Sequence, residues 1–284
     1  MIDAHHHFWR FRAEEYGWMD ASMKILQRDF LPEHLEPELA KAGVEGTVLV
    51  QARQLKEETE SLLKLAEKYP WIRGVVGWVD LCSELIGEHL QDFAPHPKLV
   101  GFRHVVHDEA DDDFMLRKDF QRGIAALGDF NLAYDLLIFP QHLGRARKLV
   151  AGFPQQTFVL DHLGKPEIRS GSLQPWKGEL EKLAAYPGVY CKLSGMVTEA
   201  NWKHWTYEDF ERYMETVLQA FGPERLMLGS DWPVCRLAGE YEEVLAIPLR
   251  FIQKLSREEQ AFIRHKTATH CYQLQTEIYG EEEI

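Results

Sequence analysis

The sequence predicts an α/β fold, a single and somewhat distorted (β/α)₈ barrel of the TIM type with a long first loop. Two observations predict it. Short apolar segments rich in β-branched residues alternate with longer segments of helical periodicity along all 284 residues. Eight such units in a chain of this length favour a closed barrel over an open sheet. We expect one domain over residues 1–284, with a frayed tail at about 280–284.

Eight segments are the expected strands, and several are nearly continuous apolar runs, as strands buried on both faces usually are. Strand–helix alternation requires right-handed crossovers, so the eight strands should be parallel. In chain order the expected strands are 2–8, 46–51, 73–79, 99–105, 131–138, 156–162, 188–194 and 225–231.

Between the strands, apolar side chains recur three or four positions apart, which indicates amphipathic helices. Gly43 is typical of a helix C-cap, and Pro223 follows another expected helix end. Residues 9–31 are rich in aromatic side chains and form the long first loop, which we expect over the barrel mouth. The periodic positions behind this prediction are Leu62, Ala66, Tyr69, Leu143, Ala146, Val150, Phe210, Met214, Val217 and Phe221.

The composition excludes several classes of protein. The formal charge is −13 and no basic stripe occurs, which argues against a nucleic-acid partner. No apolar run approaches the roughly 18 residues of a membrane helix, and the first residues carry no secretory signal. Four cysteines lie far apart without a CxxC pair, which is typical of a reduced intracellular protein. We therefore expect a cytoplasmic protein without a membrane partner.

The strongest functional signal is Asp-Ala-His-His-His at residues 3–7. Side chains two apart on a strand point to the same side, so Asp3, His5 and His7 should face one way and His6 the other. His5 and His7 would then project into the mouth at the C-terminal end of the first strand, where barrel enzymes carry their active sites. Two imidazoles in this arrangement suit a metal ion or a polarised carbonyl oxygen.

Two further polar residues end later strands at the same end of the barrel. His162 ends the apolar run at 158–161, and Asp231 ends the eighth expected strand. Taken alone, His162 would be an ordinary polar strand terminus, and Asp231 would be an aspartate that caps the next helix, which is common. Together with His5 and His7 they predict one catalytic site.

Five motifs, taken together, are more specific than any one of them: Asp-x-His-x-His-Phe-Trp (3–9), Gly-Phe-Arg-His (101–104), Val-Leu-Asp-His-Leu-Gly-Lys-Pro (159–166), Cys-Lys-Leu-Ser-Gly (191–195) and Gly-Ser-Asp-Trp-Pro (229–233). With them the chain resembles the amidohydrolase-related sugar-lactonase family, which includes fuconolactonases, rhamnonolactonases and the pyrone-dicarboxylate lactonase. The resemblance spans nearly the whole chain and implies a distorted barrel in which Asp231 handles the water. One departure is Lys266-Thr267-Ala268, where relatives often have Gly-Asn-Ala.

The expected reaction is hydrolysis of a small sugar lactone to the sugar acid. Asp231 is the candidate general base, and His5, His7 and His162 would polarise the carbonyl directly or through a divalent metal. Zn²⁺ is the ion that three histidines and a carboxylate would most readily hold. Because a lactone is an activated ester, a metal-free site is equally reasonable. The resemblance implies L-fucono-, L-rhamnono- or L-galactono-lactone as the substrate.

Six residues at or near strand ends are candidate substrate contacts. Arg103 offers a rigid donor fork, with a structural salt bridge as the alternative. Lys192 interrupts an apolar strand, so it should either face the mouth or pair with an acid such as Asp161. One of Tyr134 and Asp135 should face inwards. The full set is Arg103, His104, Lys192, Gln51, Tyr134 and Trp232.

Four tryptophans offer flat apolar faces on which a sugar ring could stack, and they are Trp9, Trp18, Trp78 and Trp232. Packing around the rim of the barrel is the simpler role for any one of them. Trp232 is the best single candidate because it follows Asp231.

Two other functions remain open at this point. A metal-dependent decarboxylase of an aromatic or muconate-type acid could use the same barrel, and a non-catalytic sugar-acid binding protein is a further alternative. No Gly-rich dinucleotide fingerprint follows the first strand, and no Gly-x-Ser-x-Gly nucleophile elbow occurs. Nucleotide binding and a serine-hydrolase route are therefore disfavoured.

Overall fold

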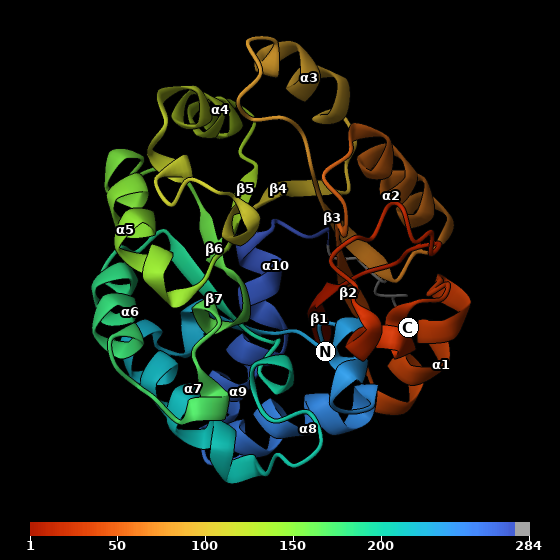
Figure 1. The fold of residues 1–284 in the computed structure, drawn as a ribbon, viewed down its shortest axis with the longest axis vertical. Coiled ribbons are helices and arrows are strands. Elements are labelled where there is room, and N and C mark those ends of the chain that lie inside the picture. The colour runs from red at the N-terminus through yellow and green to blue at the C-terminus, as the bar shows by residue number, and fades with distance from the viewer. Residues whose placement is uncertain (276–284) are drawn as a thin grey trace, which may run out of the picture.

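The computed structural model describes residues 1–275, and its eight strands form one parallel sheet in the order β1 to β8 (Figure 1). The strands are β1 (Ile2–His6), β2 (Gly46–Val50), β3 (Ile72–Gly77), β4 (Leu99–Val105), β5 (Ala133–Leu137), β6 (Phe158–Leu160), β7 (Val189–Leu193) and β8 (Leu226–Leu228). Every expected strand is present, and no end differs from its expected position by more than three residues. The expected tail at 280–284 lies outside the described residues.

The sheet closes on itself between β1 and β8. The backbone N–H of Asp231 donates to the carbonyl of His5 at 2.8 Å, and the N–H of His7 donates to the carbonyl of Trp232 at 2.7 Å. Closure removes both sheet edges and collects the C-terminal ends of the strands around one mouth. The predicted (β/α)₈ barrel is therefore confirmed.

Helices surround the barrel (Figure 1). Helix α1 ends at Gly43, whose φ of +66° is the left-handed C-cap that the sequence predicts, and Pro223 follows the end of α7. Within residues 1–275, no helix is long and apolar enough to cross a membrane. The helices are α1 (Pro32–Ala42), α2 (Lys56–Lys68), α3 (Ile86–Phe93), α4 (Lys118–Asp129), α5 (Leu143–Gly152), α6 (Trp176–Ala184), α7 (Tyr207–Phe221), α8 (Tyr241–Ile252), α9 (Arg257–Ala261) and α10 (Thr267–Cys271).

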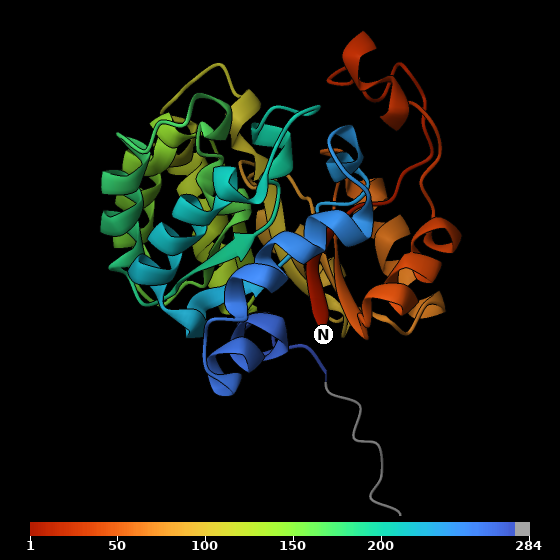
Figure 2. The same ribbon diagram turned by 90° about the horizontal axis from the view of Figure 1, so that it is seen from below.

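The apolar core has two layers. The outer layer lies between the strands and the helices, and the inner layer fills the lower part of the barrel. Figure 2 shows α10 at the lower end of the barrel, opposite the first loop, and Ala268 and Tyr272 join the inner layer from there. The strand residues of the inner layer are Ala4, Val48, Val50, Val76, Val100, Ala133, Val159 and Met227.

The segment that departs from the family pattern is helical. A π-helical turn at Phe262–Lys266 leads directly into α10. The hydroxyl of Thr267 donates to the carbonyl of Glu224 at 3.1 Å, just before β8 begins. The substitution of Lys266-Thr267 for the family's usual Gly-Asn therefore leaves α10 attached to the entrance of β8.

The long first loop covers part of the mouth, as expected. Trp9 and Phe30 pair through two backbone hydrogen bonds of 2.9 Å, which hold the two ends of the loop together. A 3₁₀ helix spans Ala21–Leu26 between them. Trp18 and Met23 line the cavity over the mouth, and Figure 2 shows the loop on that side of the barrel.

Candidate active site

A bulge in β1 decides which of its polar side chains enter the barrel. The pairing of β1 with β2 shifts by one residue between Asp3 and His6. Ala4 belongs to the inner layer below the bulge, while His5 and His7 both reach Asp231 from inside the barrel. The extra residue breaks the simple alternation of sides.

Asp3 therefore faces outwards, and the prediction that it shares a side with His5 and His7 is wrong. Its carboxylate accepts hydrogen bonds from the hydroxyls of Ser230 (2.6 Å) and Tyr241 (3.0 Å) and from the backbone N–H of Ser230 (2.9 Å). Asp3 thus fixes the chain at the point where β8 turns into Asp231.

His162 and Asp231 reach the mouth through left-handed backbone conformations. Their φ angles are +54° and +57°, and Leu163 after His162 has a φ of +57°. Such angles cost a non-glycine residue on the order of 1–2 kcal/mol, so the surrounding structure must hold them.

Two motif glycines give these side chains room. A Cβ on Gly195 would lie 2.5 Å from Nδ1 of His162, and a Cβ on Gly229 would lie 2.8 Å from the Cβ of His5. Both distances are too short for any side chain. The glycines of the Cys-Lys-Leu-Ser-Gly and Gly-Ser-Asp-Trp-Pro motifs are therefore required by the packing of the histidines.

The four predicted catalytic residues converge on one point. Nε2 of His5 lies 3.2 Å from Nε2 of His7. Oδ1 of Asp231 lies 3.4 Å from Nε2 of His7, 3.7 Å from Nε2 of His5 and 3.8 Å from Nε2 of His162. The structure thus brings together the residues that the sequence selected from three separate strands.

Three of these residues, His5, His162 and Asp231, also fit a divalent metal ion. One ligand atom each from His5, His162 and Asp231 lies within 4.8 Å of the other two. Nδ1 of His7 pairs with the carbonyl of Val50 at 2.8 Å, and Nδ1 of His162 pairs with the hydroxyl of Ser194 at 2.9 Å. Such partners orient the Nε2 atoms towards the site, as they do for metal-binding histidines in general.

Burial and neighbouring charges set the protonation of the group. Burial lowers the pKa of His162 to about 4 and holds the pKa of His5 well below its ordinary value. Burial alone would raise the pKa of Asp231, but the neighbouring His162 and His7 outweigh it and lower that pKa. At neutral pH the site therefore holds the Asp231 carboxylate beside the neutral imidazoles of His5 and His162, which can accept protons or ligate a metal.

Three of the predicted substrate contacts lie deeper, below the histidines. Nη1 of Arg103 is 3.0 Å from Oδ2 of Asp161, and its Nη2 is 3.0 Å from Oε1 of Gln51. Nζ of Lys192 is 2.5 Å from Oδ2 of Asp135 and 3.0 Å from Oδ1 of Asp161. The structure thus contains the alternative named for each residue: Arg103 forms a salt bridge, and Lys192 has acidic partners. A direct contact of Arg103, Gln51 or Lys192 with a substrate stays a prediction.

The other three predicted contacts point away from the mouth, which corrects the prediction. Tyr134 is fully buried against Phe120 of α4, and its neighbour Asp135 is the one that faces inwards. His104 stacks on Phe114, 4.7 Å between ring centroids. Alternation along β4 and β5 turns these side chains to the outer layer, because their neighbours Arg103 and Asp135 face inwards in a regular register.

Trp232 also belongs to the outer layer. Its ring packs edge to face against Phe8 and Phe30, with centroid distances of 5.8 and 5.3 Å. It does not line the cavity over the histidines, whereas Trp18 of the first loop does. The stacking role expected for Trp232 is therefore wrong. Of the four candidate tryptophans, Trp18 is the one that lines the cavity.

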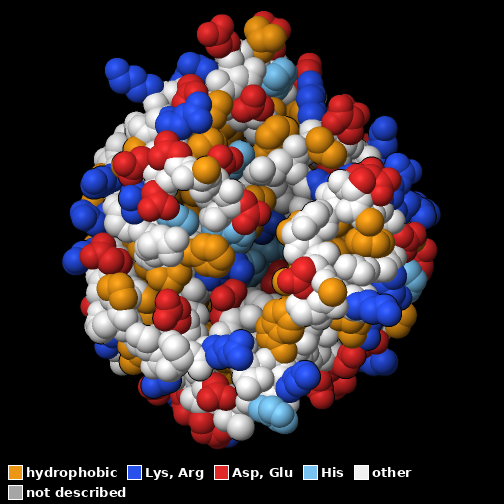
Figure 3. All heavy atoms as spheres, in the orientation of Figure 1, with side chains coloured by type: hydrophobic (Ala, Val, Ile, Leu, Met, Phe, Trp, Pro, Cys, Tyr) orange, Lys and Arg blue, Asp and Glu red, His pale blue; other side chains and the backbone are white. Residues whose placement is uncertain are grey.

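A cavity of about 330 Å³ opens above the convergent residues, with His7, His162 and Asp231 in its floor. Figure 3 looks into this hollow and shows histidine side chains inside it. Its wall combines apolar and polar side chains that the sequence analysis did not select, namely Met23, Val105, Leu137, Val234, Leu237, His107, Asp108, Lys165, Thr198, Glu199 and Trp202. Only Lys165 lies in a recognised motif, so no signal in one sequence marked the others.

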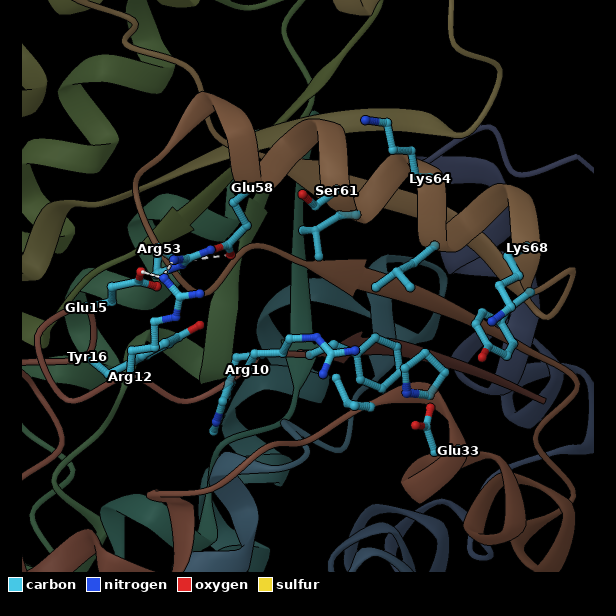
Figure 4. Close-up of a pocket in the computed structure, with 17 residues that line it drawn as sticks. Arg10, Arg12, Glu15, Tyr16, Glu33, Arg53, Glu58, Ser61, Lys64 and Lys68 are labelled. Carbon is cyan, nitrogen blue, oxygen red and sulfur yellow. Dashed lines mark hydrogen bonds and ion pairs between the residues drawn. The ribbon is translucent and has the colours of Figure 1, made fainter.

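A larger cavity, of about 700 Å³, lies beside the barrel between the first loop and α2 (Figure 4). It contains none of the convergent residues. Arg53 crosses it and forms ion pairs with Glu15 of the loop and Glu58 of α2. We assign the candidate site to the smaller cavity, because the groups that can do chemistry lie there.

Comparisons with known proteins identify the family of this chain. The amidohydrolase family model matches residues 2–274. The chain is 41% identical to the L-fucono-1,5-lactonase of Burkholderia multivorans over 284 aligned residues, which cover 96% of each protein.

Solved structures show the same relationship. An amidohydrolase from Burkholderia multivorans with bound zinc superposes with a TM-score of 0.94 at 41% identity, and the match covers 96% of this chain and 99% of that one. A dihydroxybenzoic acid decarboxylase from Polaromonas, at 13% identity and a TM-score of 0.70 over 98% of this chain and 99% of that one, shares the fold alone. The chain belongs to the amidohydrolase family.

Proposed function

We propose that this protein hydrolyses a sugar lactone, with L-fucono-1,5-lactone as the first substrate to test. The observation that carries the proposal is the Asp231 carboxylate in contact with three histidines at the floor of a small cavity. Its volume of about 330 Å³ is at the small end of the range for ligand sites, and suits a six-carbon sugar lactone. The likeness to the Burkholderia lactonase supports the substrate class.

In this mechanism Asp231 orients and deprotonates the attacking water. Its lowered pKa keeps the carboxylate ionised at neutral pH, ready to accept a hydrogen bond from that water. The hydroxyl adds to the lactone carbonyl carbon, and the proton passes to the ring oxygen as the ester bond breaks. His162, next to Asp231, stabilises the charge that develops during these steps when its Nε2 carries the proton, which the contact of its Nδ1 with the Ser194 hydroxyl permits.

The metal question follows from the same geometry. His5, His7, His162 and Asp231 would hold a divalent ion, and we propose zinc because a similar solved structure contains it. When bound, the ion would act as a Lewis acid on the carbonyl oxygen and lower the pKa of water. The roles of Asp231 as base and of the cavity wall as substrate contact are the same with or without it.

The wall of the cavity offers groups that suit a hydroxylated ring with one apolar end. Lys165 and Glu199 form an ion pair of 2.8 Å at the rim, and Asp108 adds a second carboxylate there. Val234 and Leu237 give an apolar side to the same cavity. Hydroxyl groups of the lactone would pair with the former, and a methyl group would pack against the latter.

A pH-indicator hydrolysis assay on a panel of sugar lactones tests the proposal. L-Fucono-, L-rhamnono- and L-galactono-lactone are compared with enzyme as purified, with chelator, and with zinc restored. We expect turnover of one or two lactones and its collapse in Asp231→Asn. Absence of turnover on every lactone by zinc-loaded enzyme would overturn the proposal, and a decarboxylase assay would follow. No feature of the site favours that second reaction at present.

A further inference from the structure

The middle of the first loop forms part of the wall of the candidate site. Trp18 and Met23 line the cavity above the histidines, while the pairing of Trp9 with Phe30 holds the ends of the loop. Between the loop and α2 lies the second cavity, of about 700 Å³ (Figure 4). Packing of the loop against α2 is interrupted by this cavity, so other contacts must fix the part that reaches the mouth.

Arg53 makes such a contact. Its guanidinium group crosses the second cavity, forms an ion pair with Glu15 of the loop, and lies 5.5 Å from the centroid of the Tyr16 ring (Figure 4). Among the described residues 1–275, no other residue outside the loop forms a hydrogen bond or an ion pair with residues 10–20. Arg53 is therefore the polar connection between this segment and the barrel.

The barrel side of this connection is fixed by Glu58, in the first turn of α2. Oε1 of Glu58 accepts hydrogen bonds from the backbone N–H groups of Ala52 (2.6 Å) and Arg53 (3.0 Å), and its Oε2 accepts one from Nε of Arg53. The Glu58 side chain is buried, and Ala52 itself lines the cavity of the candidate site. The guanidinium group is thus held at a set distance from that cavity.

The loop side of the connection leads to Trp18 within three residues. Glu15 and Trp18 lie in consecutive turns, which are closed by hydrogen bonds of 2.9 Å from the N–H of Glu15 to the carbonyl of Arg12 and from the N–H of Met19 to the carbonyl of Tyr16. The Trp18 side chain is 40% exposed. Because little packing surrounds this indole, the position of the turn decides where it lies.

We propose that Arg53 and Glu15 are positioning residues for the hydrolysis proposed above, because their ion pair holds the turn that carries Trp18 at the mouth. The indole then forms a fixed wall against which the lactone ring packs. Neither Arg53 nor Glu15 lines the cavity of the candidate site, so their effect reaches the substrate through Trp18. The role in substrate binding rests on the proposed function, whereas the restraint on the turn does not.

Glu15→Ala is the test, since it removes the loop end of the ion pair and keeps the contacts between Arg53 and Glu58. Glu14→Ala is the matched control: Glu14 is the preceding residue, is exposed, and forms no ion pair or hydrogen bond with any residue of the range 1–275. Arg12→Ala is a second control, because Arg12 also contacts Glu15, at 3.4 Å, but only at the surface.

The first readout is hydrogen exchange of the peptide 10–20, which requires no substrate. We expect this peptide to exchange about fivefold faster in Glu15→Ala than in the wild type, because loss of one ion pair shifts an opening equilibrium by about that factor. Exchange in Glu14→Ala and Arg12→Ala should match the wild type. Unchanged exchange in Glu15→Ala overturns the inference, and so does an equal increase in the two controls.

The second readout is a double-mutant cycle between Glu15→Ala and Trp18→Ala in lactone hydrolysis. We expect KM to rise about fivefold in Glu15→Ala with kcat within about twofold of the wild type, since a wall contact affects binding of the ground state and the transition state alike. The same change should have no effect on KM in the Trp18→Ala background. Additive effects on KM would show that Glu15 does not act through Trp18. If the wild type hydrolyses no lactone, the proposed function fails, while the exchange comparison still decides whether the ion pair holds the turn.

Discussion

The upper and lower halves of the barrel interior are built on the same strands, but apolar side chains fill the lower half and buried charged side chains occupy the upper half. In β5, β6 and β8, the lower positions are Ala133, Val159 and Met227 of the apolar inner layer. Two residues further along, β5 carries Asp135, and Asp161 directly follows the end of β6. The change from packing to charge takes one repeat of the strand. It teaches that apolar packing and polar chemistry occupy successive levels along the strand axis.

The largest expected effect is that of Asp231→Asn on catalysis. Loss of the general base should lower kcat by about 10³-fold, because proton transfer by a positioned group contributes about 10²–10⁴. The midpoint of urea unfolding should stay close to that of the wild type. Steady-state kinetics on the best lactone measure the first quantity, and a variant that keeps one tenth of the activity would remove Asp231 from the mechanism.

Lys192→Met tests the upper half and should lower the unfolding free energy of the protein strongly. It leaves Asp135 and Asp161 buried without their shared cation, which costs about 3–5 kcal/mol of unfolding free energy. Lys165→Met is the control, since its partner Glu199 is only partly buried and the exposed ion pair contributes about 1 kcal/mol or less. Urea denaturation measures the unfolding free energy of both variants. Equal losses of unfolding free energy would show that the burial of the Lys192 ion pairs does not matter.

Met227→Ala tests the lower half. A cavity in the inner layer should cost about 2–5 kcal/mol of unfolding free energy, while kcat/KM of the folded enzyme stays within about threefold of the wild type. Unfolding and kinetic measurements are made on one preparation below the unfolding transition. A loss of kcat as large as that of Asp231→Asn would contradict the division between the two halves.

Gly195→Ala should have a smaller effect, confined to the position of His162. The new Cβ would clash with its ring, and a misplacement of about 1 Å costs roughly 10²-fold in rate. Gly43→Ala is a matched control, because Gly43 is also left-handed but has open space around its Cα. It should lower stability slightly and leave kcat unchanged. Wild-type activity in Gly195→Ala would show that the position of His162 is not critical.

The sequence predicted the barrel and the four convergent residues because both depend on local patterns. Alternating segments set the strand order, and histidines or aspartates at strand ends are carried to the mouth by that order alone. The sequence could not reveal the register shifts in β1 and β4, since an extra residue in a strand leaves no trace in composition. The shift in β1 explains why the predicted orientation of Asp3 is wrong.

The rest of the site could not be predicted for a different reason. His107, Asp108 and Trp202 come from loops, where no periodicity connects sequence with direction. The hydrogen bond between Tyr272 and Asp135 joins residues 137 positions apart, and only the folded chain reveals it. Residues whose position depends on tertiary contacts therefore could not be predicted from the sequence, whereas residues at strand ends could.

Closure of the barrel between β1 and β8 also constrains the order in which a growing chain can become active. The ribosome makes His5 and His7 first, but the strand that seals them and the base Asp231 come some 220 residues later. A chain arrested before β8 would expose two open strand edges, β1 and β7, to other chains. The edge of the nascent β1 therefore stays open to pairing with other chains until the segment that seals it has been made.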